Sequence, residues 1–157
     1  MRSIAARLVI VVAITAIGVF GADSMLGTWK FNAAKSKTTS TSTNPIKSLT
    51  TVLEATPDGG VKMTRTGQLA DGTPVSFNVT FKYDGKEYPV TGGQFDTVSA
   101  KRIDANTTIF ESKKTGGKYH MTGRTVISKD GKTLTQTSKG TDAEGKPVVS
   151  TTVADKQ

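Results

Sequence analysis

The sequence contains no cysteine and only one histidine in 157 residues. The missing cysteine excludes disulfide bonds and lipid attachment at an N-terminal cysteine. A zinc site made of histidine and cysteine would have too few ligands. His120 falls on the polar side of its expected strand, and no Gly-x-Ser-x-Gly motif accompanies it. We therefore predict no catalytic residue, no metal site, no cofactor and no enzymatic activity.

Sustained helical periodicity is also missing, and regularly spaced turn signals take its place. The first three signals begin 13 residues apart and the last three 14 apart: Asp58-Gly59, Asp71-Gly72, Asp84-Gly85, Gly116-Gly117, Asp130-Gly131 and Glu144-Gly145. Such pairs are typical of type I′ hairpin turns, in which both central residues need a positive φ. The spacing leaves roughly nine or ten residues for each strand. It predicts an antiparallel β-meander whose turn carboxylates support the backbone geometry.

Between the turns, apolar and polar residues alternate with a period of two. Val75, Phe77 and Phe81 share one face of their segment and Ser76 and Asn78 the other, which is typical of a half-buried strand. Nine strands are expected, at residues 26–32, 48–56, 61–69, 75–83, 95–103, 107–114, 118–127, 132–141 and 147–154. No helix is available to cover a flat sheet, and closing the sheet removes its edges. We expect an all-β fold, an up-and-down meander closed into a barrel of about 8–10 strands, in preference to a two-sheet sandwich.

The first 21 residues have a different character. Arg2 and Arg7 precede an almost wholly apolar run at residues 8–18, and the small residues Gly21 and Ala22 follow. This layout is typical of a secretory signal peptide, and the run is short for a membrane span. We expect cleavage after Gly21 or Ala22, with retention as an N-terminal anchor as the alternative. Residues 1–21 are then the signal peptide, residues 22–157 form one domain without a transmembrane segment, and the protein is exported to the periplasm or the extracellular space.

Two stretches interrupt the meander. Residues 33–47 are rich in Ser, Thr and Lys, and they predict a long loop after the first strand or a flap over the barrel mouth. Residues 87–93 contain Pro89, which cannot donate a ladder hydrogen bond, so we expect a turn or bulge at the barrel rim there.

Four segments carry a family resemblance: residues 26–32 with Lys35-Ser36-Lys37, residues 83–92, residues 101–104 and residues 128–140. Together they resemble a family of small exported bacterial proteins of unassigned function, often described as lipocalin-like. Gly27-Thr28-Trp29 also resembles the Gly-x-Trp signature that opens lipocalin and fatty-acid-binding barrels. The resemblance implies a lipocalin-like barrel. The chain departs from the larger families because it lacks the Thr-Asp-Tyr loop motif of lipocalins and the late Arg-x-Tyr of fatty-acid-binding proteins.

Arg65 is the residue most informative about function. It shares the parity of Val61, Met63 and Leu69, so a regular strand points its guanidinium into the barrel, where it needs a partner. One hypothesis is that it holds the anionic head of a ligand. The alternatives are an internal contact with Glu54 or Trp29, or a bulge near Gly67 that turns it to solvent.

The ligand hypothesis defines a predicted binding site. Its members are Arg65, Met63, Phe77, Phe81, Tyr83, Tyr119 and Met121. Gly67 and Gly123 on inward positions would leave room for the ligand. Trp29 is expected to close the barrel as a core side chain rather than to contact the ligand.

The charge of the chain bears on its partners. The formal net charge is +8, and it is +6 without Arg2 and Arg7. Lys and Arg are spread along the chain rather than clustered among aromatics, so we expect no nucleic-acid binding, although contact with an anionic envelope surface fits the charge. The leading hypothesis is an exported, monomeric, non-catalytic protein that binds a small amphiphilic or hydrophobic ligand inside the barrel. The alternative is an envelope or extracellular interaction protein whose filled barrel contacts polymer or protein through its Thr/Lys-rich exterior.

Overall fold

The computed structural model describes residues 23–38 and 45–157. The expected signal peptide, residues 1–21, lies outside the described residues, as does the middle of the expected 33–47 loop. Every regular element within the described ranges is a β-strand. That part of the chain contains no helix long and apolar enough to cross a membrane.

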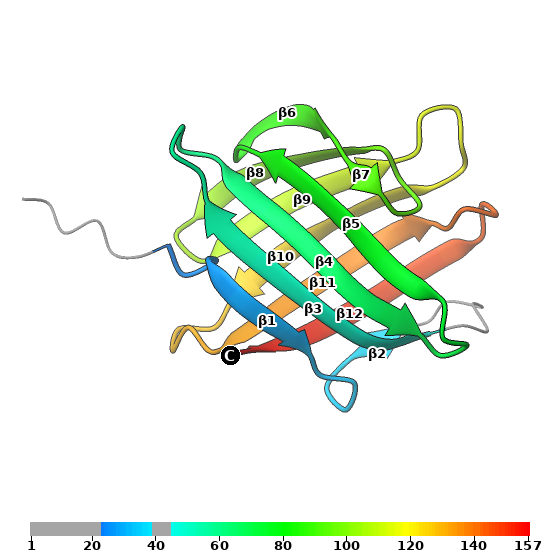
Figure 1. Ribbon diagram of the computed structural model, residues 1–157, viewed down its shortest axis with the longest axis horizontal. Coiled ribbons are helices and arrows are strands. Elements are labelled where there is room, and N and C mark those ends of the chain that lie inside the picture. Colours follow the sequence, from blue (N-terminus) through cyan, green and yellow to red (C-terminus); the bar gives the residue numbers. More distant parts are fainter. Residues whose placement is uncertain (1–22, 39–44) are drawn as a thin grey trace, which may run out of the picture.

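The described strands form one antiparallel sheet that coils into a nearly closed barrel (Figure 1). The longer strands are β1 (Gly27–Phe31), β3 (Ile46–Ala55), β4 (Val61–Leu69), β5 (Pro74–Phe81), β6 (Asp84–Pro89), β8 (Thr97–Asp104), β9 (Thr107–Lys113), β10 (His120–Ile127), β11 (Thr133–Thr141) and β12 (Pro147–Lys156). The two short ones are β2 (Lys37–Thr38) and β7 (Thr91–Gly92). The order β6-β8-β9-β10-β11-β12-β1-β3-β4-β5-β7 mostly places sequence neighbours side by side. This confirms the predicted all-β up-and-down barrel.

The segment from β6 to β7 joins the two ends of the sheet. β6 pairs with β8, and two residues later β7 pairs with β5 at Phe77–Gly92 and Asn78–Thr91. The sequence predicts a turn or bulge at residues 87–93. A register shift does occur, between Asp84 and Glu87, but most of the stretch is strand. Pro89 is compatible with this because it ends β6, where the chain leaves one neighbouring strand for the other.

The hairpin turns differ from the predicted type I′ geometry, because only glycines have a positive φ in the described chain. In the β3–β4 turn, the Gly59 N–H donates to the Thr56 carbonyl, and the Thr56 N–H donates to the Gly60 carbonyl. This is the three-residue loop in which a type I turn precedes a left-handed glycine, here Gly59 with φ 79°. The Thr56 hydroxyl and the Lys82 ammonium both contact the Asp58 carboxylate and lower its pKa to about 2.

The other turn carboxylates accept hydrogen bonds from the backbone. In each case the carboxylate of an aspartate accepts from the backbone N–H two residues later. Thr73 donates to Asp71, Lys86 to Asp84, Asn106 to Asp104, Lys132 to Asp130 and Glu144 to Asp142. Aspartate is favoured in turns because its side chain can hold the following backbone in this way. These acidic groups serve local geometry, as the sequence predicts.

Trp29 is the centre of the barrel core and is only 1% exposed. Its Nε1 donates to the Met25 carbonyl at 2.9 Å, and the Lys156 ammonium lies 5.0 Å from the ring centre. The buried residues of the same cluster include Met25, Leu53, Val61, Val79, Phe81, Ile127 and Leu134. Burying each large apolar side chain contributes about 1.5–3 kcal/mol, so this cluster is a main source of stability.

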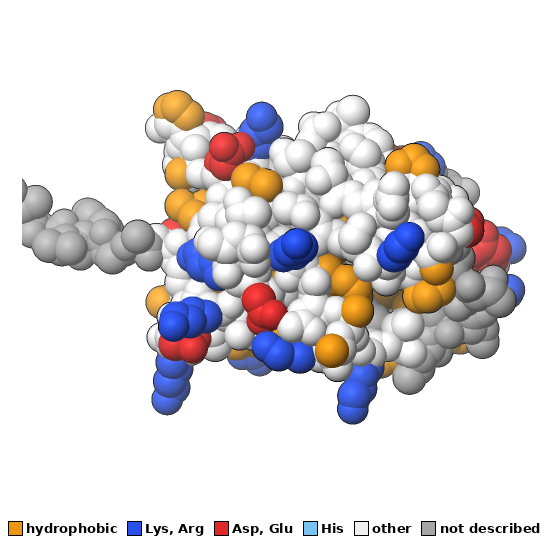
Figure 2. All heavy atoms as spheres, turned by 60° about the horizontal axis from the view of Figure 1, so that its bottom comes forward, with side chains coloured by type: hydrophobic (Ala, Val, Ile, Leu, Met, Phe, Trp, Pro, Cys, Tyr) orange, Lys and Arg blue, Asp and Glu red, His pale blue; other side chains and the backbone are white. Residues whose placement is uncertain are grey.

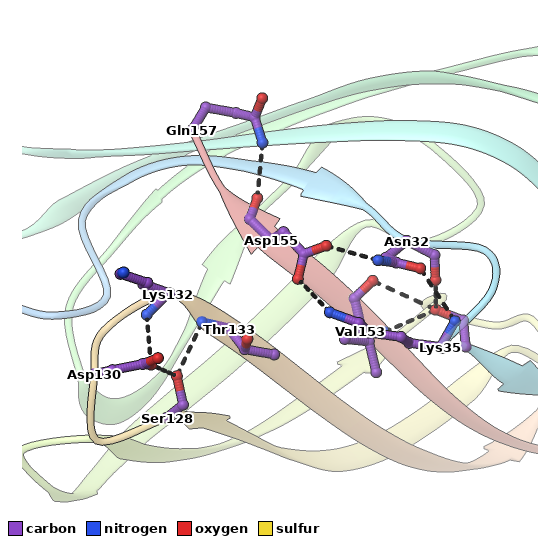
Figure 3. A network of polar contacts seen from close by, with 10 residues as sticks. Asn32, Lys35, Ser128, Asp130, Lys132, Thr133, Val153, Asp155 and Gln157 are labelled. Carbon is purple, nitrogen blue, oxygen red and sulfur yellow. Dashed lines mark hydrogen bonds and ion pairs between the residues drawn. The ribbon is translucent and has the colours of Figure 1, made fainter.

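Polar contacts attach the chain after β1 to the last strand (Figure 3). The Asn32 amide donates to one Asp155 carboxylate oxygen at 2.6 Å, and the Lys35 ammonium lies 3.1 Å from the other. β2 pairs with β12, and β3 already begins at Ile46. The predicted loop at 33–47 is therefore shorter than expected, because strand pairing occupies both of its described ends.

Candidate functional site

The barrel contains an internal cavity of about 130 Å³. All seven residues of the predicted binding site line it: Arg65, Met63, Phe77, Phe81, Tyr83, Tyr119 and Met121. Trp29 does not line it, in keeping with its place in the core. The rest of the lining is apolar or uncharged polar, so Arg65 is the only charged residue at the cavity among the described residues.

The register of the sheet explains why Arg65 points inward. Arg65 pairs with Thr51 on β3 and with Phe77 on β5, and the side chains of Thr51 and Phe77 are both buried. The register between β3 and β4 does shift, but the shift lies on β3, between Ile46 and Ser48. These two residues pair with β4 beyond Gly67. The parity of β4 is therefore continuous from Val61 to Gly67, and the bulge alternative is wrong.

The guanidinium of Arg65 crosses the interior to the far wall. Its Nε donates to the Thr51 hydroxyl at 3.1 Å, and its Nη2 donates to Gln136 Oε1 at 2.8 Å. Gln136 belongs to β11, which β12, β1 and β3 separate from β4 in the sheet. The alternative partners are not used, since Glu54 is exposed on the outer face and Lys156 is the cation over Trp29.

The remaining guanidinium nitrogen of Arg65, Nη1, has no hydrogen-bond partner among the described residues. Fully enclosed side-chain nitrogens and oxygens in that part of the chain all have partners, so Nη1 retains accessible surface. Arg65 lines this cavity and also a smaller one of about 20 Å³ beside Trp29. A cation with an unused donor is thus available inside the barrel.

The electrostatics of Arg65 are unusual because neither hydrogen-bond partner carries a charge. Burial lowers the pKa of the guanidinium, and no ion pair joins Arg65 to a carboxylate within the described ranges, which contain all 13 Asp and Glu residues. Arginine nevertheless stays protonated in proteins, so the positive charge remains. Arg102 is the contrasting case, because it forms an ion pair with Asp23 at 2.5 Å and stacks over Tyr83 at 4.3 Å.

Three aromatic rings form the other prominent part of the cavity wall. Phe95 meets Phe77 edge to face with centroids 5.0 Å apart, and it stacks on Tyr119 at 5.4 Å with 15° between the planes. The Arg65 guanidinium carbon lies 5.5 Å from the Phe77 ring centre. Burial raises the pKa of the Tyr119 phenol, so the ring stays neutral near pH 7.

Phe95 lies at the boundary between the cavity and solvent. The sequence predicts it as the first residue of a strand, but β8 begins only at Thr97 and Phe95 belongs to the preceding loop. It lines the cavity and is also partly exposed. Gly92 and Gly93, with φ of 82° and 81°, give that loop a backbone which other residues rarely adopt. Phe95 therefore forms part of the mouth.

Gly67 and Gly123 do not leave room for a ligand, contrary to the prediction. A Cβ atom on Gly67 would lie 2.1 Å from the Ser48 carbonyl oxygen of the neighbouring strand. A Cβ atom on Gly123 would lie 2.5 Å from the Phe110 ring. Both glycines allow close packing of the barrel wall, so the space that they leave is already filled.

Among the lining residues that sequence analysis misses, Thr51, Phe95 and Gln136 bear most directly on Arg65 and the aromatic wall. The alternation of Leu49, Thr51 and Leu53 was a usable signal for Thr51, since the two leucines mark the inward face. No local pattern indicates Gln136, because it approaches Arg65 only through barrel closure.

Outside this cavity, His120 is exposed and contacts Glu111 at 2.6 Å, and no three potential metal ligands gather in the described ranges.

A second hollow, of about 750 Å³, lies on the outer wall across β8 to β12 and is called the outer trough below. It is lined by two rows of outward residues, each of which crosses the strands from β8 to β12 through paired positions. The first row is Lys101, Ile109, Arg124, Thr137 and Thr151, and the second is Ser99, Glu111, Thr122, Lys139 and Val149. Ile109 and Val149 are 43% and 55% exposed. Elsewhere, on the face shown in Figure 2, Lys and Arg side chains stand apart from one another.

Together, the fold and the cavity define a small all-β barrel in which Arg65 is the one charged residue that lines the cavity among the described residues. No family model and no curated protein matches the chain. Among solved structures, the chain is similar to EF1p2_mFAP2b bound to DFHBI, with a TM-score of 0.50, 11% identity, and coverage of 87% of this chain and 96% of that chain. It is also similar to a redesigned β-barrel, mFAP1, bound to DFHBI, with a TM-score of 0.45, 13% identity, and coverage of 85% and 95%. At such identities the likeness supports the barrel fold alone.

Proposed function

We propose that this protein is an exported, non-catalytic carrier that binds a small amphiphilic ligand inside its barrel. The observation that carries the proposal is the Arg65 guanidinium, which lines the cavity with Nη1 open and without a carboxylate partner among the described residues. Burying a cation without a counter-charge is costly, so an anionic ligand group would complete the site. The apolar wall around it suits the rest of an amphiphile.

Other features support a carrier rather than a catalyst. Among the described residues, the lining contains no histidine, lysine or carboxylate, and burial raises the pKa of its two phenols, Tyr83 and Tyr119, so that they stay protonated near pH 7. The layout of residues 1–21 and the resemblance to small exported lipocalin-like bacterial proteins agree with a role outside the cytoplasm. A barrel that binds DFHBI shares this architecture, which makes ligand binding in the interior geometrically reasonable.

Native mass spectrometry of the protein purified gently from its producing cells tests this proposal. Thr125 and Thr122 lie on the same strand but on opposite faces, so two matched variants separate the interior from the exterior. Thr125→Met fills the cavity, and Thr122→Met fills the outer trough. We expect a stoichiometric adduct of a few hundred daltons or less on the wild type and on Thr122→Met, and none on Thr125→Met. An adduct that survives Thr125→Met, or no adduct on any form together with no binding of added ligands, would contradict the carrier proposal.

The outer trough favours a second candidate function, contact with an anionic polymer or envelope surface. Lys101, Arg124 and Lys139 provide positive charge there, and Ile109 and Val149 provide exposed apolar surface. Such contact would weaken as salt screens the charges. Retention on an anionic polysaccharide column at low salt, lost in a Lys101→Gln/Lys139→Gln double variant, would favour this candidate. Unchanged retention in the double variant would exclude the trough as the contact surface.

A further inference from the structure

The size of the cavity limits the ligand, if the proposed function holds. Engineered apolar cavities of about 150 Å³ hold one benzene molecule, whereas sites for drug-sized ligands are typically about 300–1,000 Å³. The cavity here measures about 130 Å³. It is therefore no larger than a cavity that holds one benzene molecule, so it can take at most one six-membered ring and not a long acyl chain.

The charge of the cavity limits the ligand further. Within residues 23–38 and 45–157, Arg65 is the only charged residue in the lining, and its hydrogen-bond partners Thr51 and Gln136 are neutral. A monoanion would balance this single positive charge. A dianion such as a phosphate monoester would leave a net negative charge buried without a partner, which is strongly unfavourable. The site therefore fits a carboxylate better than a phosphate.

The donors at the Arg65 end suit the two oxygens of a carboxylate. A guanidinium has five N–H groups in a planar fork, and two of them have protein partners. Because arginine only donates, the oxygen of Gln136 must face it, so the Gln136 NH₂ group points elsewhere. That NH₂ group has no partner among the described residues, and it is not fully enclosed. Arg65 Nη1 and Gln136 Nε2 are therefore two unused donors, and both residues line the cavity.

The apolar part of the wall suits a flat ring. Phe77, Phe95 and Tyr119 present aromatic surfaces, and Met63 and Met121 add sulfur atoms that pack well against aromatic edges. Aromatic rings attract one another in edge-to-face and offset-stacked arrangements, which a saturated ring of equal size cannot form.

From these limits we infer that the ligand is a monocyclic aromatic carboxylate. Its carboxylate accepts hydrogen bonds from Arg65 Nη1 and Gln136 Nε2, and its ring lies among Phe77, Phe95 and Tyr119. The size of the cavity, its single unpaired cation and its aromatic wall together select this class.

Calorimetric titration of the purified protein with four probes tests the inference. Benzoate has the required charge and size, benzyl alcohol lacks the charge, phenyl phosphate has excess charge, and decanoate has the charge on a long chain. We expect benzoate to bind roughly 10- to 100-fold more tightly than benzyl alcohol, since the alcohol lacks the negative charge and the second acceptor oxygen of the carboxylate. Phenyl phosphate and decanoate should bind more weakly than benzoate. Chemical-shift changes at the Met63 and Met121 methyl groups locate the binding in the cavity.

Variants assign the effect to Arg65. Arg65→Met should lose the preference for benzoate over benzyl alcohol. Arg124→Met removes a guanidinium from the exposed outer face and is the matched control, which should bind like the wild type. If Arg65→Met does not fold, Arg65→Gln retains a polar group towards Thr51 and Gln136 and should show the same loss of preference.

The outcomes separate this inference from the carrier proposal. Equal affinity for benzoate and benzyl alcohol, or an undiminished benzoate preference in both Arg65 variants, overturns the aromatic-carboxylate inference while ligand binding stands. Tightest binding of decanoate or phenyl phosphate likewise overturns the ligand class alone. Absence of methyl shifts with every probe, together with no adduct in native mass spectrometry, overturns both.

Discussion

Replacing Arg65 with methionine should scarcely change the stability of the ligand-free protein. Holding an unpaired guanidinium in the interior costs several kcal/mol. The hydrogen bonds to Thr51 and Gln136 offset this cost, because each contributes about 1.5–3 kcal/mol. The two contributions are of similar size, and methionine is apolar and retains the stem of the side chain as far as the position of Nε. We therefore expect the free energy of unfolding of Arg65→Met to lie within about 1.5 kcal/mol of the wild-type value.

Arg102→Met is the contrasting variant. Arg102 donates to both carboxylate oxygens of Asp23 and stacks over Tyr83, and it is only 28% exposed. Its replacement leaves Asp23 without its counter-charge, so we expect a loss of about 1.5–3 kcal/mol.

Urea denaturation followed by Trp29 fluorescence provides the measurement. Trp29 is the only tryptophan and is 1% exposed, so its emission reports the loss of the core. The protein must be ligand-free, because a bound ligand adds to the apparent stability. A loss of about 3 kcal/mol or more in Arg65→Met is what breaking a buried ion pair produces. That result would mean that Arg65 has a structural role and would refute the reasoning.

Three further outcomes are expected. The contacts of Asp58 lower its pKa from 3.8 to about 2. The stability that this carboxylate contributes is therefore present above pH 3.8 and is lost as the pH falls towards 2. The urea midpoint of Asp58→Asn should accordingly fall less on acidification than that of the wild type. Phe95→Ala opens the cavity mouth, so stopped-flow association of benzoate should be faster, and an unchanged rate would place the entrance elsewhere. Gly123→Ala places a Cβ atom 2.4 Å from the Thr137 carbonyl oxygen and 2.5 Å from the Phe110 ring, and should lower the free energy of unfolding by about 1–3 kcal/mol.

Much of the site follows from strand parity. The period of two along β4 and β5 already places Met63, Arg65, Phe77 and Phe81 on one face, and the structure places all four at the cavity. The all-β meander follows as well, because glycine at regular intervals marks most reversals of the chain. The exceptions are Asp84-Gly85, which lies within β6, and the reversal between β8 and β9 at Ala105-Asn106, which contains no glycine. Both features are local, since they depend on residues close together in sequence, and a pattern of neighbours is sufficient to predict them.

Other local predictions failed because a neighbouring strand decides them. Gly67 and Gly123 occupy inward positions, yet Ser48 and Phe110 fill the space beside them. The turns contain the expected residues, but the hydrogen bonds of the Gly59 loop select a type I turn instead of type I′.

By itself, the sequence determined the barrel class and most of the turn positions, because alternation and turn chemistry act over a few residues. It left both the inward and the solvent-facing direction of Arg65 open, and the register of β3 and β4 decided between them. Only the tertiary structure decided that Arg65 reaches Gln136 rather than a carboxylate, since β4 and β11 come together through closure of the whole sheet. The same closure sets the cavity volume and brings Phe95 against Tyr119. Distances between residues on distant strands depend on every strand between them, and therefore no local pattern contains them.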